Sequence, residues 1–191
     1  MELFEAIFQR RSADKVRPDP VPRELIEKIL AAAVQAPNHF KVRPWRFFVL
    51  TGAARERLGD CMAEAVKKRN PNLSPEALAA VMDVERARPL RAPVVIAVGV
   101  DRPSETRVIE VENICAAAAA VQNMLLAAHA LGLGAKWRTG NPAYDPDVKD
   151  FFGLAPDQHL IGFIYLGFPV VDPSAAPPPA RPSFEDRTHW M

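Results

Sequence analysis

The sequence predicts an α+β protein with a central sheet between layers of helices. Residues 93–100 (PVVIAVGV) and 159–166 (HLIGFIYL) are continuous apolar runs, which are typical of central strands buried on both faces. Segments around them carry apolar residues at helical spacing, so helices and strands interleave. Because the helices differ widely in length and the strands are few, the pattern favours a three-layer α+β domain. A chain of 191 residues is long enough to bury its own core.

The N-terminal part is predicted to contain two helices and one strand. Apolar residues at helical spacing predict a short helix over residues 2–10. A proline-rich connector follows, and Pro22 suits the first turn of a second helix, which ends before Pro37. Residues 45–50 are apolar and aromatic and predict a strand.

The middle of the chain is predicted to be mostly helical. An amphipathic helix over residues 53–69 is followed, after a proline-containing break, by a polar helix over residues 75–86. Residues 107–131 form the longest predicted helix, whose many alanines favour close contact between helices and which ends at glycines. A short strand through residues 136–138 precedes the second of the two long apolar strands.

The C-terminal segment differs in composition from the rest. Residues 171–191 are rich in proline, with serine and alanine, and cannot form a core of their own. We expect this tail either to be disordered or to lie extended on another surface, such as a second subunit. Residues 1–170 then form a single domain.

Composition and missing motifs narrow the function. The net charge of +1 argues against binding to nucleic acid or a membrane surface through bulk electrostatics. The N-terminus is acidic without a long apolar run, and polar residues interrupt the alanine-rich stretch, so we expect a cytoplasmic protein without a membrane span. The four histidines and two cysteines lack ligand spacing, which predicts no metal site. Phosphate-loop, dinucleotide-glycine and zinc-protease motifs are absent from the sequence.

Three polar segments are candidates for ligand binding. Arg10-Arg11-Ser12 places two guanidinium groups and a hydroxyl at a helix end, which suits a phosphate, although a solvated basic helix end explains it equally well. Residues 36–45 (APNHFKVRPW) carry several polar side chains before a strand, which favours ligand contact over simple loop bonding. In residues 137–140 (WRTG), the glycine leaves room for a flat ring, while a strand edge with a solvated arginine is the alternative.

In their order and spacing, these motifs resemble the flavin-dependent nitroreductases, specifically the short single-domain branch. The resemblance covers nearly the whole chain. It rests on R-R-S after the first helix, A-P-x-H-x-x-x-R-P-W-x-F before the first long strand, W-R-T-G after the long helix, and the proline-rich tail. It implies a three-layer α/β/α sandwich with a mixed, mainly antiparallel sheet, and an intimate homodimer with FMN at each of two interface sites.

The resemblance also implies roles for individual residues. The motif of residues 10–12 would contact the FMN phosphate and ribityl chain, and the histidine and arginine of residues 39–43 would contact the flavin from the facing subunit or its edge. Residues 137–139 would line the ring and its N5 side, and a basic residue of the tail would reach the phosphate. The expected cofactor-binding residues are Arg10, Arg11, Ser12, His39, Arg43, Trp137, Arg138, Thr139 and Arg181.

One position departs from the family pattern. Many members carry lysine or arginine two positions after the serine, near the pyrimidine edge of the flavin, whereas this chain has Asp14. Reduction makes the flavin anionic, so positive charge is needed near its N1 and C2 carbonyl. Arg10, Lys15 and Arg43 are the candidates from the sequence.

The implied activity is that of an NAD(P)H-dependent FMN oxidoreductase with a ping-pong cycle. NADH or NADPH delivers a hydride to flavin N5 and leaves, and an electron-poor acceptor such as a nitroaromatic, quinone or enone takes the same place. The flavin carries the chemistry, so no protein residue is expected to be catalytic. Residues 53–88 would form a helical excursion over the active site, with its lysines on a solvated face.

Two alternatives from other classes stay open. One is a non-redox protein that binds or stores flavin, and the other is a helical interaction protein that uses its alanine-rich helix and proline-rich tail. The sequence does not choose between NADH and NADPH or among acceptors.

Overall fold

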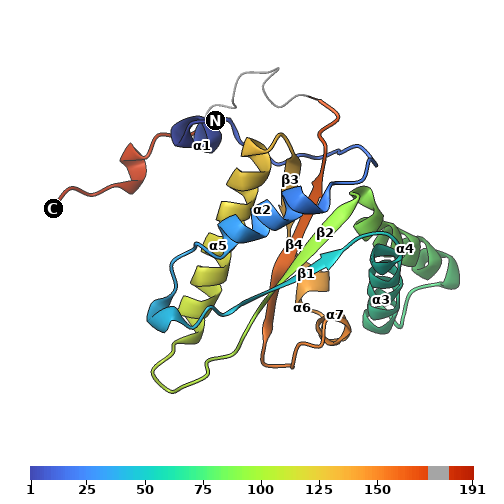
Figure 1. The fold of residues 1–191 in the computed structure, drawn as a ribbon. Coiled ribbons are helices and arrows are strands. Elements are labelled where there is room, and N and C mark those ends of the chain that lie inside the picture. The colour runs from blue at the N-terminus through green and yellow to red at the C-terminus, as the bar shows by residue number, and fades with distance from the viewer. Residues whose placement is uncertain (172–180) are drawn as a thin grey trace.

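The centre of the fold is a four-stranded antiparallel sheet with the order β1-β2-β4-β3 (Figure 1). A computed structural model describes residues 1–171 and 181–191. The two continuous apolar runs form the two inner strands, as predicted, because only strands covered on both faces can bury every side chain. The strands are β1 (Trp45–Leu50), β2 (Val94–Val100), β3 (Gly134–Arg138) and β4 (His159–Gly167).

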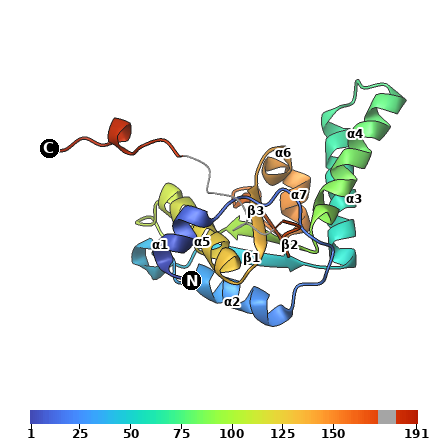
Figure 2. The same cartoon turned by 90° about the horizontal axis from the view of Figure 1, so that it is seen from above.

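Two helices cover one face of the sheet, namely α2 (Arg23–Ala33) and α5 (Glu110–Ala130) (Figure 2). Every second residue of β2, beginning with Val94, packs against the alanines of α5. Ala117 and Ala120 of α5 are fully buried, and their small side chains let the helix lie close to the sheet and to α2. The helix α5 also has the length and hydropathy of a membrane span, a test that the core helix of a soluble protein passes as well.

The opposite face is covered by α3 (Ala53–Arg69) and by two short helices after β3, α6 (Asn141–Tyr144) and α7 (Pro146–Phe151). Leu58 and Met62 of α3 are buried against the other set of β2 side chains, as the amphipathic pattern predicted. The three-layer α+β architecture is therefore confirmed. Parallel pairing in the described residues is confined to one isolated bridge at Ser12.

Most predicted boundaries agree closely with the structure, with corrections at the helices. The long helix begins at Glu110 rather than residue 107, because the residues before it form a turn. The helices α6 and α7 were not predicted. Each has a proline in its first turn and is too short for a periodic pattern, so its sequence looks like a loop.

The helices α3 and α4 (Pro75–Ala87) form a hairpin that extends away from the sheet (Figure 2). Gly59 lies where the two helices touch. A Cβ atom at this position would lie 2.3 Å from the carbonyl oxygen of Arg86, which belongs to the α4 backbone. The absence of a side chain at Gly59 therefore permits the close packing of the hairpin.

We expect Gly59→Ala to lower the free energy of unfolding by about 1–3 kcal/mol, because one helix backbone must move away from the other. Denaturant unfolding measures the effect. Gly99→Ala in β2 is the matched comparison, since its Cβ would meet the ends of the Leu154 and Phe48 side chains at 3.1 to 3.2 Å and these can shift. Equal losses in both variants would contradict the role given to Gly59.

The described part of the tail, residues 181–191, lies beyond α1 (Leu3–Gln9) and away from the sheet (Figure 1). Large apolar side chains are exposed on both segments, including Phe4 at 70%, Phe8 at 68% and Trp190 at 90%. Exposed apolar surface is typical of sites that contact another molecule. The prolines at positions 173 and 177–179 of the predicted tail lie outside the described residues.

Candidate functional site

The segment after α1 lies along the free edge of β3. Ser12 forms a parallel bridge with Ala135, and the N–H of Ala13 donates to the carbonyl oxygen of Ala135 at 3.0 Å. Gly134 permits this close approach, because a Cβ there would lie 2.8 Å from the Cβ of Ala13. The R-R-S and W-R-T-G motifs are therefore brought to the same sheet edge, one at each end of β3.

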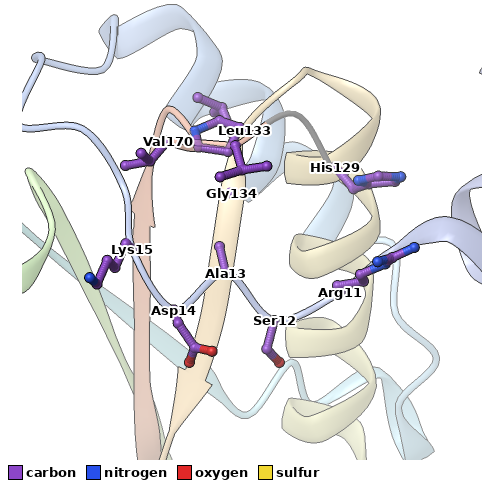
Figure 3. A pocket seen from close by; sticks show the side chains of 11 residues that line it. Arg11, Ser12, Ala13, Asp14, Lys15, His129, Leu133, Gly134 and Val170 are labelled. Carbon is purple, nitrogen blue, oxygen red and sulfur yellow. The ribbon is translucent and has the colours of Figure 1, made fainter. Parts of the chain in front are cut away.

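A pocket of about 370 Å³ opens at the end of this edge where β3 begins, beside Gly134 (Figure 3). Residues 11–15, the C-terminal end of α5 and residues 169–171 line it. The side chains of Ser12 and Asp14 point to the same side of the segment, whereas Lys15 points away from both (Figure 3). His129 and Arg11 lie together at one side of the pocket (Figure 3).

Positive side chains converge at this end of the edge. Burial lowers the pKa of the Arg10 guanidinium, and the nearby Arg181 lowers it further. Burial also lowers the pKa of His129, with Arg10 and Arg11 acting in the same direction and Glu5 opposing them. The dipole of α5 attracts cations to its C-terminus. The approach of Arg10 to Arg181 is unfavourable, and an anion bound between them would offset the repulsion.

His129 adds a second sign of an incomplete site. The side chain is 8% exposed, and its Nε2 atom has no hydrogen-bond partner among residues 1–171 and 181–191. A buried polar atom without a partner is costly, so such atoms often mark a ligand position. The predicted phosphate-binding residues Arg10, Arg11, Ser12 and Arg181 thus fit an anion here, and His129 joins them as a residue that the sequence did not single out.

Trp137 and Arg138 point to opposite faces of β3. Trp137 packs towards α5, and its Nε1 donates to the carbonyl oxygen of Ile161 at 3.0 Å. Arg138 faces the other side, with its guanidinium 5.3 Å from the ring centre of Tyr165. The Nε atom of Arg138 is buried and has no hydrogen-bond partner in the part of the chain that the structure describes.

The turn after β3 leaves backbone open to a ligand. Thr139 is exposed, and Gly140 has a φ of +105°, which only glycine adopts without strain. Trp137 and Thr139 also line a pocket of about 350 Å³ beside Tyr144 of α6. The geometry at this end fits a flat ring lying against the turn.

His39 and Arg43 lie elsewhere in the chain. The Nδ1 atom of His39 is 2.6 Å from Oε2 of Glu112 in the first turn of α5. From Glu112 to His129 the helix spans roughly 25 Å at 1.5 Å per residue. Within one chain, the structure therefore does not bring His39 to the cluster around Arg10.

The loop that carries His39 and Arg43 is strained. Phe40, Lys41 and Arg43 have φ values of 50°, 56° and 51°, although none is glycine. The Oδ1 atom of Asn38 accepts a hydrogen bond from the N–H of Arg43 at 2.8 Å, which helps to hold the loop. Backbone strain of this kind persists at binding and active sites, and no sequence pattern signals it.

The α3–α4 hairpin is tied to the segment that follows Gly140. Arg69 donates to Asp145 at 2.7 Å, and the Asp145 side chain is only 3% exposed. Lys68 pairs with Asp147 at 2.7 Å. Both lysines of this helix are exposed, as expected for a solvated face. Lys67 pairs with Glu64 on the same helix at 3.5 Å, whereas Lys68 pairs across to Asp147.

Comparison with protein families identifies relatives of the chain. The model described as Nitroreductase family matches residues 7–168. The putative NAD(P)H nitroreductase YdjA of Escherichia coli strain K12 is 34% identical over 182 residues, which cover 92% of this chain and 93% of that protein. The putative NAD(P)H nitroreductase YfhC of Bacillus subtilis is 30% identical over 168 residues, or 87% of this chain and 84% of that protein.

Solved structures are similar over the same length. A nitroreductase-like family protein from Bacillus cereus has a TM-score of 0.84 and 25% identity, and covers 100% of this chain and 96% of its own. A putative nitroreductase from Desulfovibrio desulfuricans, solved in complex with FMN, has a TM-score of 0.74 and 28% identity, with 100% and 97% coverage.

Proposed function

Because this chain belongs to the nitroreductase family, it is an oxidoreductase that uses FMN and NADH or NADPH, and we propose that it works by a ping-pong cycle. When bound, FMN supplies the hydride chemistry: the nicotinamide donor reduces it and departs, and the acceptor is then reduced in the same place. We propose an electron-poor acceptor such as a nitroaromatic, a quinone or an enone. The nicotinamide donors are cytoplasmic metabolites, so we place the enzyme in the cytoplasm.

One observation carries this proposal: a single sheet edge joins a cationic cluster to an open backbone turn. Arg10, Arg181 and the orphaned Nε2 of His129 fit the FMN phosphate at one end. At the other end, Thr139 and Gly140 give a ring room to lie against the backbone. The chain's own residues bind and orient the cofactor, which is the role expected of the protein in a flavoenzyme.

A homodimer completes the proposed site. His39 and Arg43 lie roughly 25 Å from the Arg10 cluster along α5, and we propose that they reach the same flavin from a facing subunit. The exposed apolar surfaces of α1 and of residues 181–191 provide area for that contact. In this arrangement residues 1–170 form the FMN-binding domain, and the tail of residues 171–191 packs on the partner subunit.

The helical excursion is proposed to cover the active site. Its α3 helix is anchored through Arg69 to Asp145, five residues after Gly140 at the proposed ring end. The Asp145 carboxylate is buried, so losing its arginine partner would leave a buried charge uncompensated, and the pair favours a fixed position of the hairpin beside the turn. Acceptor size would then depend on the space under residues 53–88.

The proposed function predicts a yellow protein whose colour NADH or NADPH removes. We expect a flavin absorbance spectrum after purification, bleaching under anaerobic titration with at least one of the two donors, and recovery on adding a nitroaromatic or a quinone. Steady-state rates at varied donor and acceptor should give parallel double-reciprocal lines.

Two other results would contradict the proposal. A bound flavin that neither donor bleaches would favour the alternative of a flavin-binding or storage protein. A colourless dimer without affinity for added FMN would favour the interaction protein.

A further inference from the structure

Asp14 forms an ion pair with Lys136 beside the middle of the β3 edge. The Nζ atom of Lys136 donates to Oδ1 of Asp14, although the two residues are 122 positions apart in the sequence. The Lys136 side chain is 28% exposed, and that of Asp14 is 80% exposed. Because Ser12 is bridged to Ala135, this pair lies between the phosphate end of the site and the turn at Gly140.

The register of the sheet places further positive charge on the same face. Lys136 is opposite Tyr165 and therefore shares a face with Arg138 two residues along β3. Lys136 lowers the pKa of Asp14 through its hydrogen bond and its charge, and Arg138 adds a smaller effect in the same direction. The carboxyl of Asp14 thus stays ionised and tethered to Lys136.

Tyr165, which is opposite Lys136, has further charged groups near its hydroxyl. Burial raises the pKa of the Tyr165 hydroxyl, while Arg138, Arg88 and Arg91 act against that rise. Glu85 also faces this hydroxyl, but it is paired with Arg88 at 2.7 Å. Together with Asp14 and Lys136, these groups leave the face with more positive than negative side chains.

The three cations that the sequence suggested for the pyrimidine ring of the flavin lie in less suitable positions than Lys136. Lys15 points away from Asp14 and Ser12 (Figure 3). Arg10 lies with Arg181 and His129 at the phosphate end. Arg43 belongs to the loop held at the other end of α5, so in the proposed dimer it approaches the flavin from the facing subunit and not from the β3 edge that carries Asp14.

We propose that Lys136 supplies the positive charge at the pyrimidine end of the flavin, and that Asp14 moderates it. The inference rests on the proposed function. A hydride carries two electrons and one proton, so its transfer from NADH or NADPH to neutral flavin leaves one net negative charge on the ring and releases the oxidised nicotinamide. A nearby cation stabilises that charge and favours the reduced form, while a carboxylate on the same cation weakens the effect.

The test is the midpoint potential of the bound flavin, measured by equilibration with a reference dye. Lys136→Met keeps the aliphatic chain and removes the charge. We expect this substitution to lower the equilibrium ratio of reduced to oxidised flavin at least tenfold. For a two-electron couple, that corresponds to a midpoint potential lower by about 30 mV. Lys136→Arg should restore the potential, and Asp14→Asn should raise it because Lys136 loses its carboxylate partner.

Lys15→Met tests the rival cation, which lines the same pocket but points away from Asp14, and should leave the potential closer to wild type than Lys136→Met. A wild-type potential in Lys136→Met with FMN still bound would overturn the inference, as would a lower potential in Lys15→Met alone. A wild-type protein that binds no FMN would instead contradict the proposed function on which the inference depends. Thermal unfolding of each variant separates a change in potential from a loss of fold.

Discussion

Arg10→Ala is expected to weaken FMN binding by roughly ten- to hundredfold, the cost of one or two hydrogen bonds to a charged group. Arg10 is half-buried beside Arg181 and His129, so the phosphate would meet a guanidinium that is already partly desolvated and positioned. Charge-assisted hydrogen bonds are strongest in such surroundings. Fluorescence titration of FMN into the apoprotein measures the affinity, and the flavin content of the purified variant gives an independent value.

The matched control is Arg23→Ala on α2. Arg23 is 87% exposed in its side chain and pairs with Glu27 on the same helix, so its loss should leave FMN affinity unchanged. Inorganic phosphate should compete with FMN in the wild type and compete less in Arg10→Ala. Unchanged flavin content in the Arg10 variant would remove Arg10 from the phosphate end of the site.

The parts of the fold that were predictable have strong local patterns. The strands β2 and β4 are continuous apolar runs, and α3 carries Leu58 and Met62 at helical spacing, so each element is determined by its own residues. The helices α6 and α7 escaped prediction because four and six residues are too few for a periodic pattern. Their formation depends on the sheet face that they cover.

Some residues of the candidate site could likewise be predicted from the sequence, and others could not. The short motifs of residues 10–12 and 137–140 were recognisable because each keeps its polar residues together in the chain. The partnership of Asp14 with Lys136 was not, since it depends on how the segment after α1 is placed on β3. His129 was overlooked for a similar reason, because its neighbours Arg10 and Arg11 lie far from it in the sequence.

Mixed dimers of Arg10→Ala and Arg43→Ala subunits should regain FMN at one of their two sites. If each site takes Arg10 from one subunit and Arg43 from the other, a mixed dimer has both substitutions at one site and neither at the second. Two different affinity tags allow the mixed dimer to be purified, and its flavin content is compared with those of the two parent variants, both of which we expect to lose FMN.

The reason lies in the distance along α5. His39 is fixed to its first turn and Arg10 lies beside its last, so a single chain holds these groups roughly 25 Å apart. If each site were instead built within one chain, each of the two sites in the mixed dimer would carry one substitution, and neither would bind flavin. A mixed dimer without flavin, or an Arg43→Ala homodimer that keeps its FMN, would contradict the proposal that the two subunits share each site. Recovery of flavin in the mixed dimer alone requires that the two motifs meet across a subunit interface.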